Sequence, residues 1–257
     1  MALLDGQALA GRTVLLTGAS GGIGRVTAGV LAGAGAHVVA QYRTGRTQAE
    51  LALAGVPPTS RTLVGADLST PQAARQLWRE TDRQRRIDVL VLNAAVSVDT
   101  PLDGPDEQWD AGWEETLRVN VLGAGALLRE ATRAFAGRGG GVAVVVSSWA
   151  ALQGSRIRDA SAYAASKAAI RNLAQTLARA YVRDGVQVHV VAPGVVDTGI
   201  AVRGMDDETR AAVAEGLAMG RHVTADEVAA MIGVLATGSC PSLTGSTVDI
   251  NGASYIR

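Results

Sequence analysis

The chain has 257 residues, 47% of them hydrophobic and 19% charged, and its 24 basic side chains balance its 24 acidic ones. This composition is typical of a globular protein, and zero net charge argues against nucleic-acid binding as the main function because no field attracts a phosphate backbone. A single cysteine, Cys240, and an N-terminus without the regions of a signal peptide predict a cytoplasmic protein, and no apolar run is long enough to predict a membrane span.

Short apolar segments alternate along the chain with segments of helical spacing. The expected strands are residues 13–17, 36–41, 61–65, 87–92, 142–146, 186–191 and 246–250. The expected helices lie near residues 22–34, 71–83, 106–135, 160–184 and 224–235. This alternation predicts an α/β fold, with a doubly wound parallel sheet of about seven strands, flanked by helices on both faces. No linker or repeat interrupts the pattern, so residues 1–257 are expected to form a single domain.

Residues 199–221 do not fit this pattern. They follow an expected strand, are rich in charge and contain Met205 and Met219 without a clear strand period. Segments of this kind often cover a binding site. We therefore expect a substrate lid at 199–221.

Residues 17–24 read TGASGGIG and lie between the first expected strand and the first expected helix. Glycines allow a tight turn and a close approach of the backbone to a pyrophosphate, and the N–H groups at the start of the helix favour an anion. The motif therefore predicts a Rossmann-type dinucleotide-binding domain. A glycine turn with a purely structural role is the alternative.

The residues after the second expected strand indicate which dinucleotide binds. An NAD(H) site usually places an acidic residue about 20 residues after the glycines. Residues 6–49 contain no carboxylate, and the strand is followed by Arg43 and Thr44, with Arg46 close behind. A guanidinium presents a fork of donors that suits a 2′-phosphate. NADP(H) is therefore favoured over NAD(H), although these arginines are also consistent with solvated side chains of an arginine-rich chain.

Tyr163 and Lys167 lie four residues apart in an expected helix, which places both on one helix face. A free tyrosine has a pKa of about 10 and exchanges protons poorly near neutrality unless a cation stabilises the phenolate. Lys167 is the only lysine of the chain, which favours a role that arginine cannot fill. A surface pair without function is the alternative.

With the glycine motif and this pair together, the sequence resembles the classical short-chain dehydrogenase/reductase family, including its 3-oxoacyl-carrier-protein reductase members, across nearly its full length. The resemblance implies an NADP(H)-dependent oxidoreductase that transfers a hydride between the nicotinamide and a carbonyl or secondary alcohol, with Tyr163 as general acid/base. Ser148 would bind the substrate oxygen, and Lys167 would bind the nicotinamide ribose and lower the pKa of Tyr163. Asn120 would hold a water that links Lys167 to solvent.

Further motifs carry the same resemblance. Its implied cofactor-binding residues are Thr17, Gly18, Ser20, Gly22, Ile23, Gly24, Arg43, Thr44, Asp67, Leu68, Asn93, Ala94, Tyr163, Lys167, Pro193, Gly194, Val196 and Thr198. The chain departs from the family at Ala95, where a glycine is usual. The spacing from Ser148 to Tyr163 is two residues longer than usual, which places an insertion in residues 155–159. Ser147 is the alternative to Ser148, and Ser161 a more distant one.

The substrate is expected to be a small-molecule carbonyl or alcohol that contacts Ser148, Trp149 and Tyr163. Further residues that would line its pocket are Gln153, Met205 and Met219, with Arg156, Arg158 and Arg203 as candidates to meet an acidic group. The three histidines, His37, His189 and His222, share no metal-ligand spacing, so no metal is expected.

Two other functions remain open from the sequence. One is a non-catalytic NADP(H)-binding sensor or scaffold, and the other is an epimerase or dehydratase with the same tyrosine and lysine, which the absence of a large C-terminal substrate domain disfavours. The family resemblance also implies a homotetramer.

Overall fold

The computed structural model describes residues 4–202 and 204–256. Its centre is one seven-stranded sheet with the order β3-β2-β1-β4-β5-β6-β7, and every pair of neighbouring strands is parallel. The strands are β1 Thr13–Leu16, β2 His37–Tyr42, β3 Arg61–Gly65, β4 Val89–Leu92, β5 Gly141–Val146, β6 Val186–Pro193 and β7 Thr247–Ile250. The strand order reverses between β1 and β4, which confirms the predicted doubly wound, Rossmann-type sheet.

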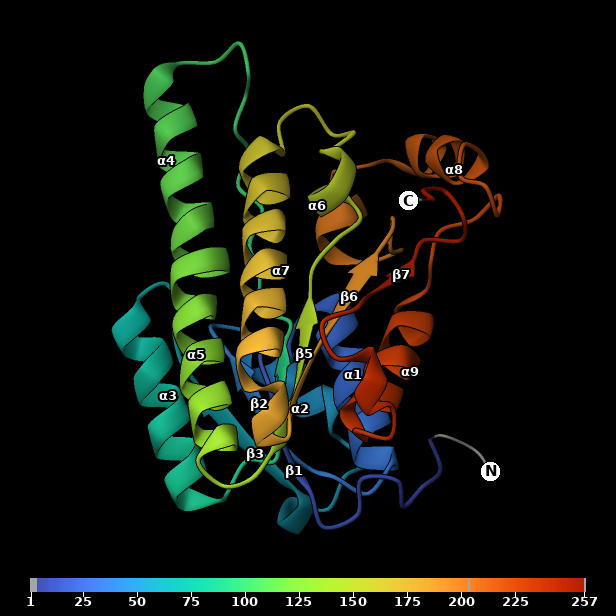
Figure 1. The fold of residues 1–257 in the computed structure, drawn as a ribbon. Coiled ribbons are helices and arrows are strands. Elements are labelled where there is room, and N and C mark those ends of the chain that lie inside the picture. The colour runs from blue at the N-terminus through green and yellow to red at the C-terminus, as the bar shows by residue number, and fades with distance from the viewer. Residues whose placement is uncertain (1–3, 203, 257) are drawn as a thin grey trace.

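Helices cover both faces of this sheet (Figure 1). They are α1 Gly22–Gly33, α2 Arg46–Ala52, α3 Pro71–Gln84, α4 Asp106–Leu117, α5 Ala124–Ala136, α6 Ala150–Gln153, α7 Ser161–Tyr181, α8 Asp207–Glu215 and α9 Ala225–Ala236. The predicted helix at 106–135 is divided by a π-helical turn, η2, at Arg118–Gly123. Single 3-10 turns lie at Pro58–Ser60, Val182–Asp184, Gly199–Val202 and Pro241–Leu243.

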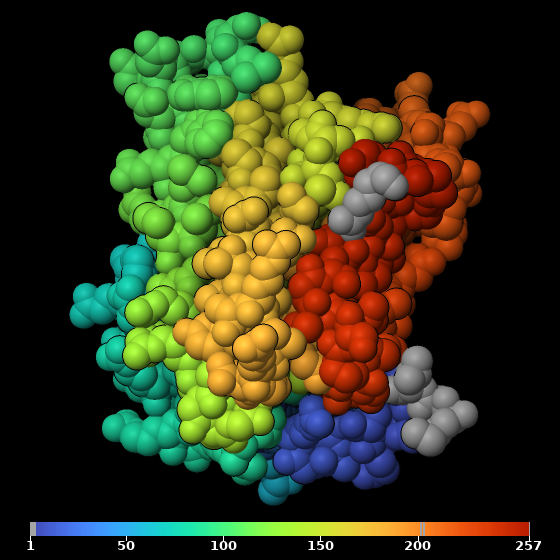
Figure 2. Space-filling model, viewed as in Figure 1, coloured from blue at the N-terminus to red at the C-terminus, as the bar shows by residue number. Residues whose placement is uncertain are grey.

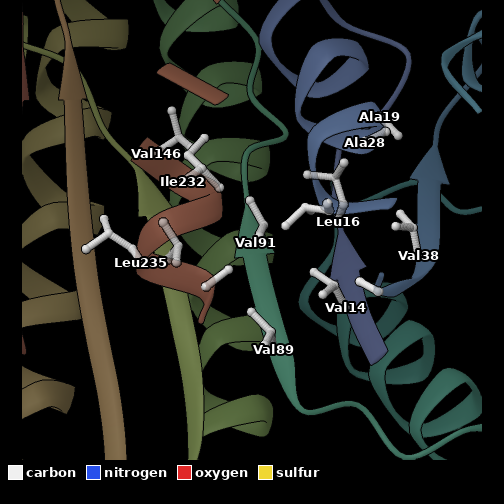
Figure 3. Packing of buried hydrophobic residues seen from close by; sticks show 14 of the residues in the cluster. Val14, Leu16, Ala19, Ala28, Val38, Val89, Val91, Val146, Ile232 and Leu235 are labelled. Atoms are coloured by element: carbon white, nitrogen blue, oxygen red, sulfur yellow. The ribbon is translucent and has the colours of Figure 1, made fainter. Parts of the chain in front are cut away.

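The core consists of two hydrophobic clusters, one on each face of the sheet. Val14 and Leu16 of β1 pack in the cluster beneath α1 and α9, together with Ile232 (Figure 3). Leu15, between them, packs in the other cluster with residues of α3, α5 and α7, among them Phe135. Successive side chains of a strand point to opposite faces, so a strand buried on both sides reads as a continuous apolar run. This is why the central strands could be predicted from the sequence.

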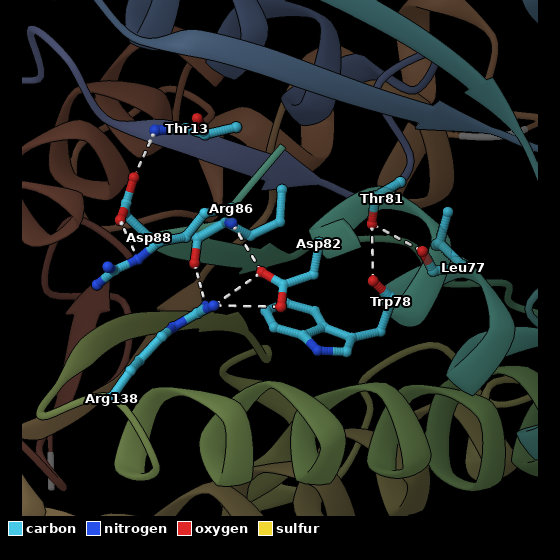
Figure 4. Close-up of polar contacts among 9 residues, drawn as sticks. Thr13, Leu77, Trp78, Thr81, Asp82, Arg86, Asp88 and Arg138 are labelled. Carbon is cyan, nitrogen blue, oxygen red and sulfur yellow. Dashed lines mark hydrogen bonds and ion pairs between the residues drawn. The ribbon is translucent and has the colours of Figure 1, made fainter. Parts of the chain in front are cut away.

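Carboxylates hold the chain at the amino ends of β1 and β4 (Figure 4). Asp88 Oδ2 accepts a hydrogen bond from the main-chain N–H of Thr13 at 2.9 Å. Asp82, near the end of α3, accepts from the N–H of Ile87 at 2.8 Å and pairs with Arg138 Nη1 at 3.0 Å. These contacts fix one end of the central strands and leave their carboxyl ends to form a site.

The C-terminal segment lies against α7, and Figure 2 shows the two side by side on one face of the molecule. Gln175 Nε2 donates to the main-chain oxygen of Gly245 at 3.5 Å, and β7 pairs with β6. Within residues 4–202 and 204–256, no helix combines the length and apolar character that a membrane crossing needs.

The expected lid at 199–221 contains a 3-10 turn and the helix α8, which the sequence analysis did not predict. Asp206 caps α8, because its carboxylate accepts a hydrogen bond from the N–H of Thr209 at 2.8 Å. Acidic residues at positions 206–208 are a helix-start signal that was available in the sequence. The helix was missed because none of its residues is buried, so it carries no apolar periodicity.

Candidate active site

A pocket of about 1070 Å³ opens at the carboxyl ends of the strands, next to the reversal of strand order between β1 and β4. Open α/β sheets bind their ligands at this position. The predicted site residues that line the pocket are Gly18, Ser20, Gly22, Ile23, Gly24, Arg43, Thr44, Asp67, Leu68, Asn93, Ala94, Ser148, Trp149, Tyr163, Lys167, Pro193, Gly194, Val196 and Thr198. Of the predicted catalytic and cofactor-binding residues, Thr17 and Asn120 do not belong to the lining.

The glycine turn leaves no room for larger side chains. Gly18 has a φ of 68°, and a Cβ on Gly24 would lie 2.1 Å from the Gly18 oxygen. A Cβ on Gly22 would lie 1.9 Å from Thr198 Oγ1, so the segment after β6 closes tightly over the turn. The N-cap of α1 is Gly21, which supplies no side-chain cap, and the first turn carries no acidic residue. This helix start therefore fits the pyrophosphate of a dinucleotide.

Thr17 does not line the pocket but binds the main chain of residues that do. Its buried Oγ1 accepts hydrogen bonds from the main-chain N–H groups of Asn93 at 2.9 Å and Ala94 at 3.0 Å. Thr17 thereby joins the end of β1 to the turn after β4.

Gln41 is a pocket residue that the sequence analysis missed. Its Oε1 accepts from the N–H of Gly18 at 2.9 Å, and its Nε2 donates to the oxygen of Ala66 at 2.7 Å. The side chain is 2% exposed and holds the glycine turn against the end of β3. A polar residue within an otherwise apolar strand was the signal.

Ala95, which replaces the family's usual glycine, adopts an ordinary backbone conformation. Among the described residues, Ala253 is the only non-glycine residue with a positive φ. Alanine at position 95 therefore causes no left-handed strain and adds only a methyl group to the pocket lining.

Ser148, Tyr163 and Lys167 converge in the pocket from two elements. Ser148 follows β5, whereas Tyr163 and Lys167 lie one helical turn apart on α7. Ser148 is the side chain next to the Tyr163 hydroxyl. Lys167 Nζ donates to the main-chain oxygen of Val146 at 2.8 Å and lies 5.7 Å from the centroid of the Tyr163 ring.

The contacts of the alternative serines explain why Ser148 is the one beside Tyr163. Ser147 Oγ donates to the main-chain oxygen of Lys167 at 2.9 Å and so attaches β5 to α7. Ser161 Oγ lies 2.8 Å from Thr100 Oγ1. The longer spacing to Tyr163 is taken up by residues 154–160, between α6 and α7.

Burial sets the protonation of the pair. Burial raises the pKa of Tyr163 to about 12, and the neighbouring Ser148 hydroxyl opposes this rise. Burial also lowers the pKa of Lys167 to about 8. The Lys167 ammonium donates to Val146 O rather than to the phenol, and its expected lowering of the Tyr163 pKa stays a prediction.

Asn120 lies in the π-helical turn between α4 and α5 and is 2% exposed. Its Oδ1 accepts from the N–H of Val96 at 2.9 Å, and its Nδ2 donates to the Val96 oxygen at 2.8 Å and to Ser166 Oγ at 3.0 Å. The side chain thus connects the turn after β4 with α7. Its predicted role in holding a water stays a prediction.

At the glycine-turn end of the pocket, Arg43 and Thr44 are exposed lining residues. Arg46 differs, because its Nε pairs with Glu50 Oε1 at 2.8 Å within α2. Asp67 also lines the pocket, and its Oδ1 accepts from the N–H of Ser69 at 2.9 Å.

The other end of the pocket is largely apolar. Trp149 and Met205 line it as predicted, together with Val213 and Leu217 in and after α8, so the expected lid borders the pocket. Gln153 and Met219 are not part of the lining.

The arginines predicted near the substrate separate in the structure. Arg156 lines the pocket, whereas Arg158 forms an ion pair with Asp103. Arg203 lies outside the described residues. No group of three or more His, Cys, Asp and Glu side chains in the described part of the chain is arranged to hold a metal ion.

Comparisons with known proteins show which family the chain is similar to. Residues 12–209 match the family model for short chain dehydrogenases. The chain is 32% identical to 2-dehydro-3-deoxy-D-gluconate 5-dehydrogenase of Bacillus subtilis (strain 168), over 99% of each chain. It is 28% identical to the 3-oxoacyl-[acyl-carrier-protein] reductase of Escherichia coli (strain K12), over 96% of this chain and 98% of that protein.

A solved structure is similar as well. It is described as an NAD(P)-dependent gluconate 5-dehydrogenase of Beutenbergia cavernae with bound NADP at low occupancy. The TM-score is 0.86 with 32% sequence identity, over 97% of this chain and 99% of that one.

Proposed function

Because this chain belongs to the short chain dehydrogenase family, we propose that it is an NADP(H)-dependent oxidoreductase that acts on a carbonyl or secondary alcohol. The observation that carries the proposal is the convergence of Ser148, Tyr163 and the buried Lys167 in the pocket that begins at the glycine turn. The variant Tyr163→Phe tests the assignment of Tyr163 as general acid/base.

A nicotinamide cofactor held at the glycine turn would supply or accept a hydride. In the direction of reduction, Tyr163 would donate its hydroxyl proton to the substrate oxygen as the carbonyl carbon takes up the hydride. The Ser148 hydroxyl donates a hydrogen bond to the same oxygen, where negative charge develops. In the direction of oxidation, Tyr163 must first lose its own proton, and its phenolate oxygen then accepts the hydroxyl proton of the alcohol.

Lys167 contributes a positive charge within the pocket. With a pKa of about 8, its side chain is mostly protonated at pH 7. A charge in a poorly solvated site acts strongly on its neighbours. The ammonium favours the phenolate that Tyr163 forms when it gives up its proton, and it is a donor for the nicotinamide ribose hydroxyls.

The preference for NADP(H) can be tested by calorimetric titration with NADPH and NADH at matched ionic strength. NADPH should bind at least tenfold more tightly, a difference of about 1.4 kcal/mol. Arg43→Ala should remove most of this preference, because the variant lacks the guanidinium at the pocket edge that would contact the 2′-phosphate.

Arg46→Ala is the matched control, since Arg46 is nearby but pairs with Glu50. It should leave the preference unchanged. Equal binding of the two cofactors by the unmodified protein would refute the 2′-phosphate assignment. A preference that survives in Arg43→Ala would place the phosphate contact elsewhere.

The substrate class is proposed more broadly. Two of the proteins compared above are named for gluconates and the third for a 3-oxoacyl group, which supports a secondary alcohol or ketone as the reacting group. The α8 region borders the same pocket and is proposed to be the substrate lid. The cytoplasmic location and the homotetramer stay predictions.

A further inference from the structure

Arg156 occupies a fixed position in the pocket lining. Its guanidinium carbon lies 5.0 Å from the centroid of the Trp149 ring, so the two planar groups form a cation–π contact. Trp149 directly follows Ser148, which places this contact in the part of the pocket where the substrate oxygen is expected.

The Trp149 side chain that contacts Arg156 is packed against neighbouring residues. Trp149 is 8% exposed and packs with Ala150, Ala164 and Leu217 in a small hydrophobic cluster. Its main-chain N–H donates to the oxygen of Pro193 at 2.9 Å. The platform beneath the guanidinium is therefore part of the folded core of this region.

The segment that contains Arg156 is anchored at both ends. Gly154, with a φ of 80°, ends α6 and donates to Ala150 O at 3.0 Å. At the other end, the oxygen of Asp159 accepts from Thr100 N at 2.7 Å and from Thr100 Oγ1 at 3.0 Å. The loop that contains the extra residues between Ser148 and Tyr163 is thus held at both ends by hydrogen bonds.

The two arginines of this loop differ in their partners. Arg158 forms an ion pair with Asp103. Arg156 forms no ion pair with any residue in 4–202 or 204–256, and it is exposed. The contact with the Trp149 ring uses none of its N–H donors as an ion pair would, so these donors are available to a ligand.

The charges of the lining distinguish the two ends of the pocket. Among the described residues, its charged residues are Arg43, Asp67, Asp99, Arg156 and Lys167. Arg43 and Asp67 follow β2 and β3, and Lys167 is buried with its ammonium on Val146. Of the cations in the described part of the chain, Arg156 is therefore the accessible one at the Trp149 end.

We propose that Arg156 binds a carboxylate of the substrate, so that the substrate is a hydroxy acid or keto acid with its carboxylate apart from the reacting carbon. A guanidinium can donate two parallel N–H···O hydrogen bonds to the two oxygens of a carboxylate. This assignment rests on the proposed function, which supplies the reacting group.

Binding of two inert probes tests the assignment. Cyclohexanecarboxylate and cyclohexanecarboxamide have nearly the same shape and differ in charge, and their affinities can be measured by ligand-observed NMR titration of the protein with NADPH. The carboxylate should bind roughly 10- to 100-fold more tightly, as a charged hydrogen-bonded pair implies. Arg156→Gln should bring the two affinities together.

Arg158→Gln removes an equal charge from the same loop and should leave the preference intact. Equal binding of the two probes to the unmodified protein, binding of neither, or a preference retained in Arg156→Gln would each overturn the proposal. The probes do not react, so the result is independent of turnover. If the unmodified protein reduces carbonyl compounds but binds both probes equally, only the role of Arg156 is refuted. If the unmodified protein prefers the carboxylate probe but has no activity, only the proposed reaction is refuted.

Discussion

Tyr163→Phe should reduce kcat/KM roughly 100- to 10,000-fold, the range that general acid/base catalysis contributes. The substitution removes only the phenolic oxygen, which is the atom that would exchange a proton with the substrate. The ring remains on α7 beside Ser148, and the glycine turn is untouched. The Kd for NADPH should therefore stay close to that of the unmodified protein.

Steady-state kinetics with the first carbonyl compound found to be reduced, followed through NADPH absorbance, measure this effect. Tyr181→Phe is the matched control, because Tyr181 lies at the end of the same helix, away from the pocket, and packs against the core. It should leave kcat/KM unchanged. Activity retained by Tyr163→Phe would assign the proton transfer to another group and contradict the mechanism.

The sheet and the glycine turn could be predicted because local residue patterns determine them. The strands are apolar runs buried on both faces, and the turn needs glycine at positions where a Cβ would strike the backbone or Thr198. The short helices α2, α6 and α8 escaped prediction. They are short and bury few residues, so no apolar periodicity marks them in the sequence.

The sequence could predict which residues belong to the candidate site, but not which contacts their side chains make. The sequence could not decide between Ser147 and Ser148, since both follow β5, and only the fold shows that Ser147 bonds to Lys167 O. It assigned Asn120 to hold a water that links Lys167 to solvent, but it could not show that the Asn120 side chain also bonds to Val96 and Ser166. Such contacts join residues far apart in the sequence, and no spacing rule records them.

Lys167→Arg should lower kcat/KM by roughly 100-fold, in the range found when a group that stabilises developing charge is lost. Arginine keeps the positive charge, but the buried site is shaped around a compact ammonium that donates to Val146 at 2.8 Å. Kinetic assays and NADPH titration measure the effect. Full activity in Lys167→Arg would show that any cation suffices and that the single lysine has no special role.

Lys167→Met should also change how stability depends on pH. Burial lowers the pKa of Lys167 from 10.5 to about 8, so between these values the unfolded chain binds more protons than the folded one. Stability therefore rises with pH through this window in the unmodified protein, relative to a variant without the ammonium. From pH 7.5 to pH 9.5 the difference in unfolding free energy between the two proteins should move by about 2 kcal/mol in favour of the unmodified one.

Urea unfolding at pH 7.5, 8.5 and 9.5 gives this difference directly. Comparing the two proteins removes the contributions of all other titrating groups, and staying below pH 10 avoids Tyr163, whose pKa is raised to about 12. A difference that is flat, or that falls with pH, would mean that the ammonium is well solvated in the folded protein. In that case Lys167 would lack the poorly solvated charge on which its proposed action at Tyr163 depends.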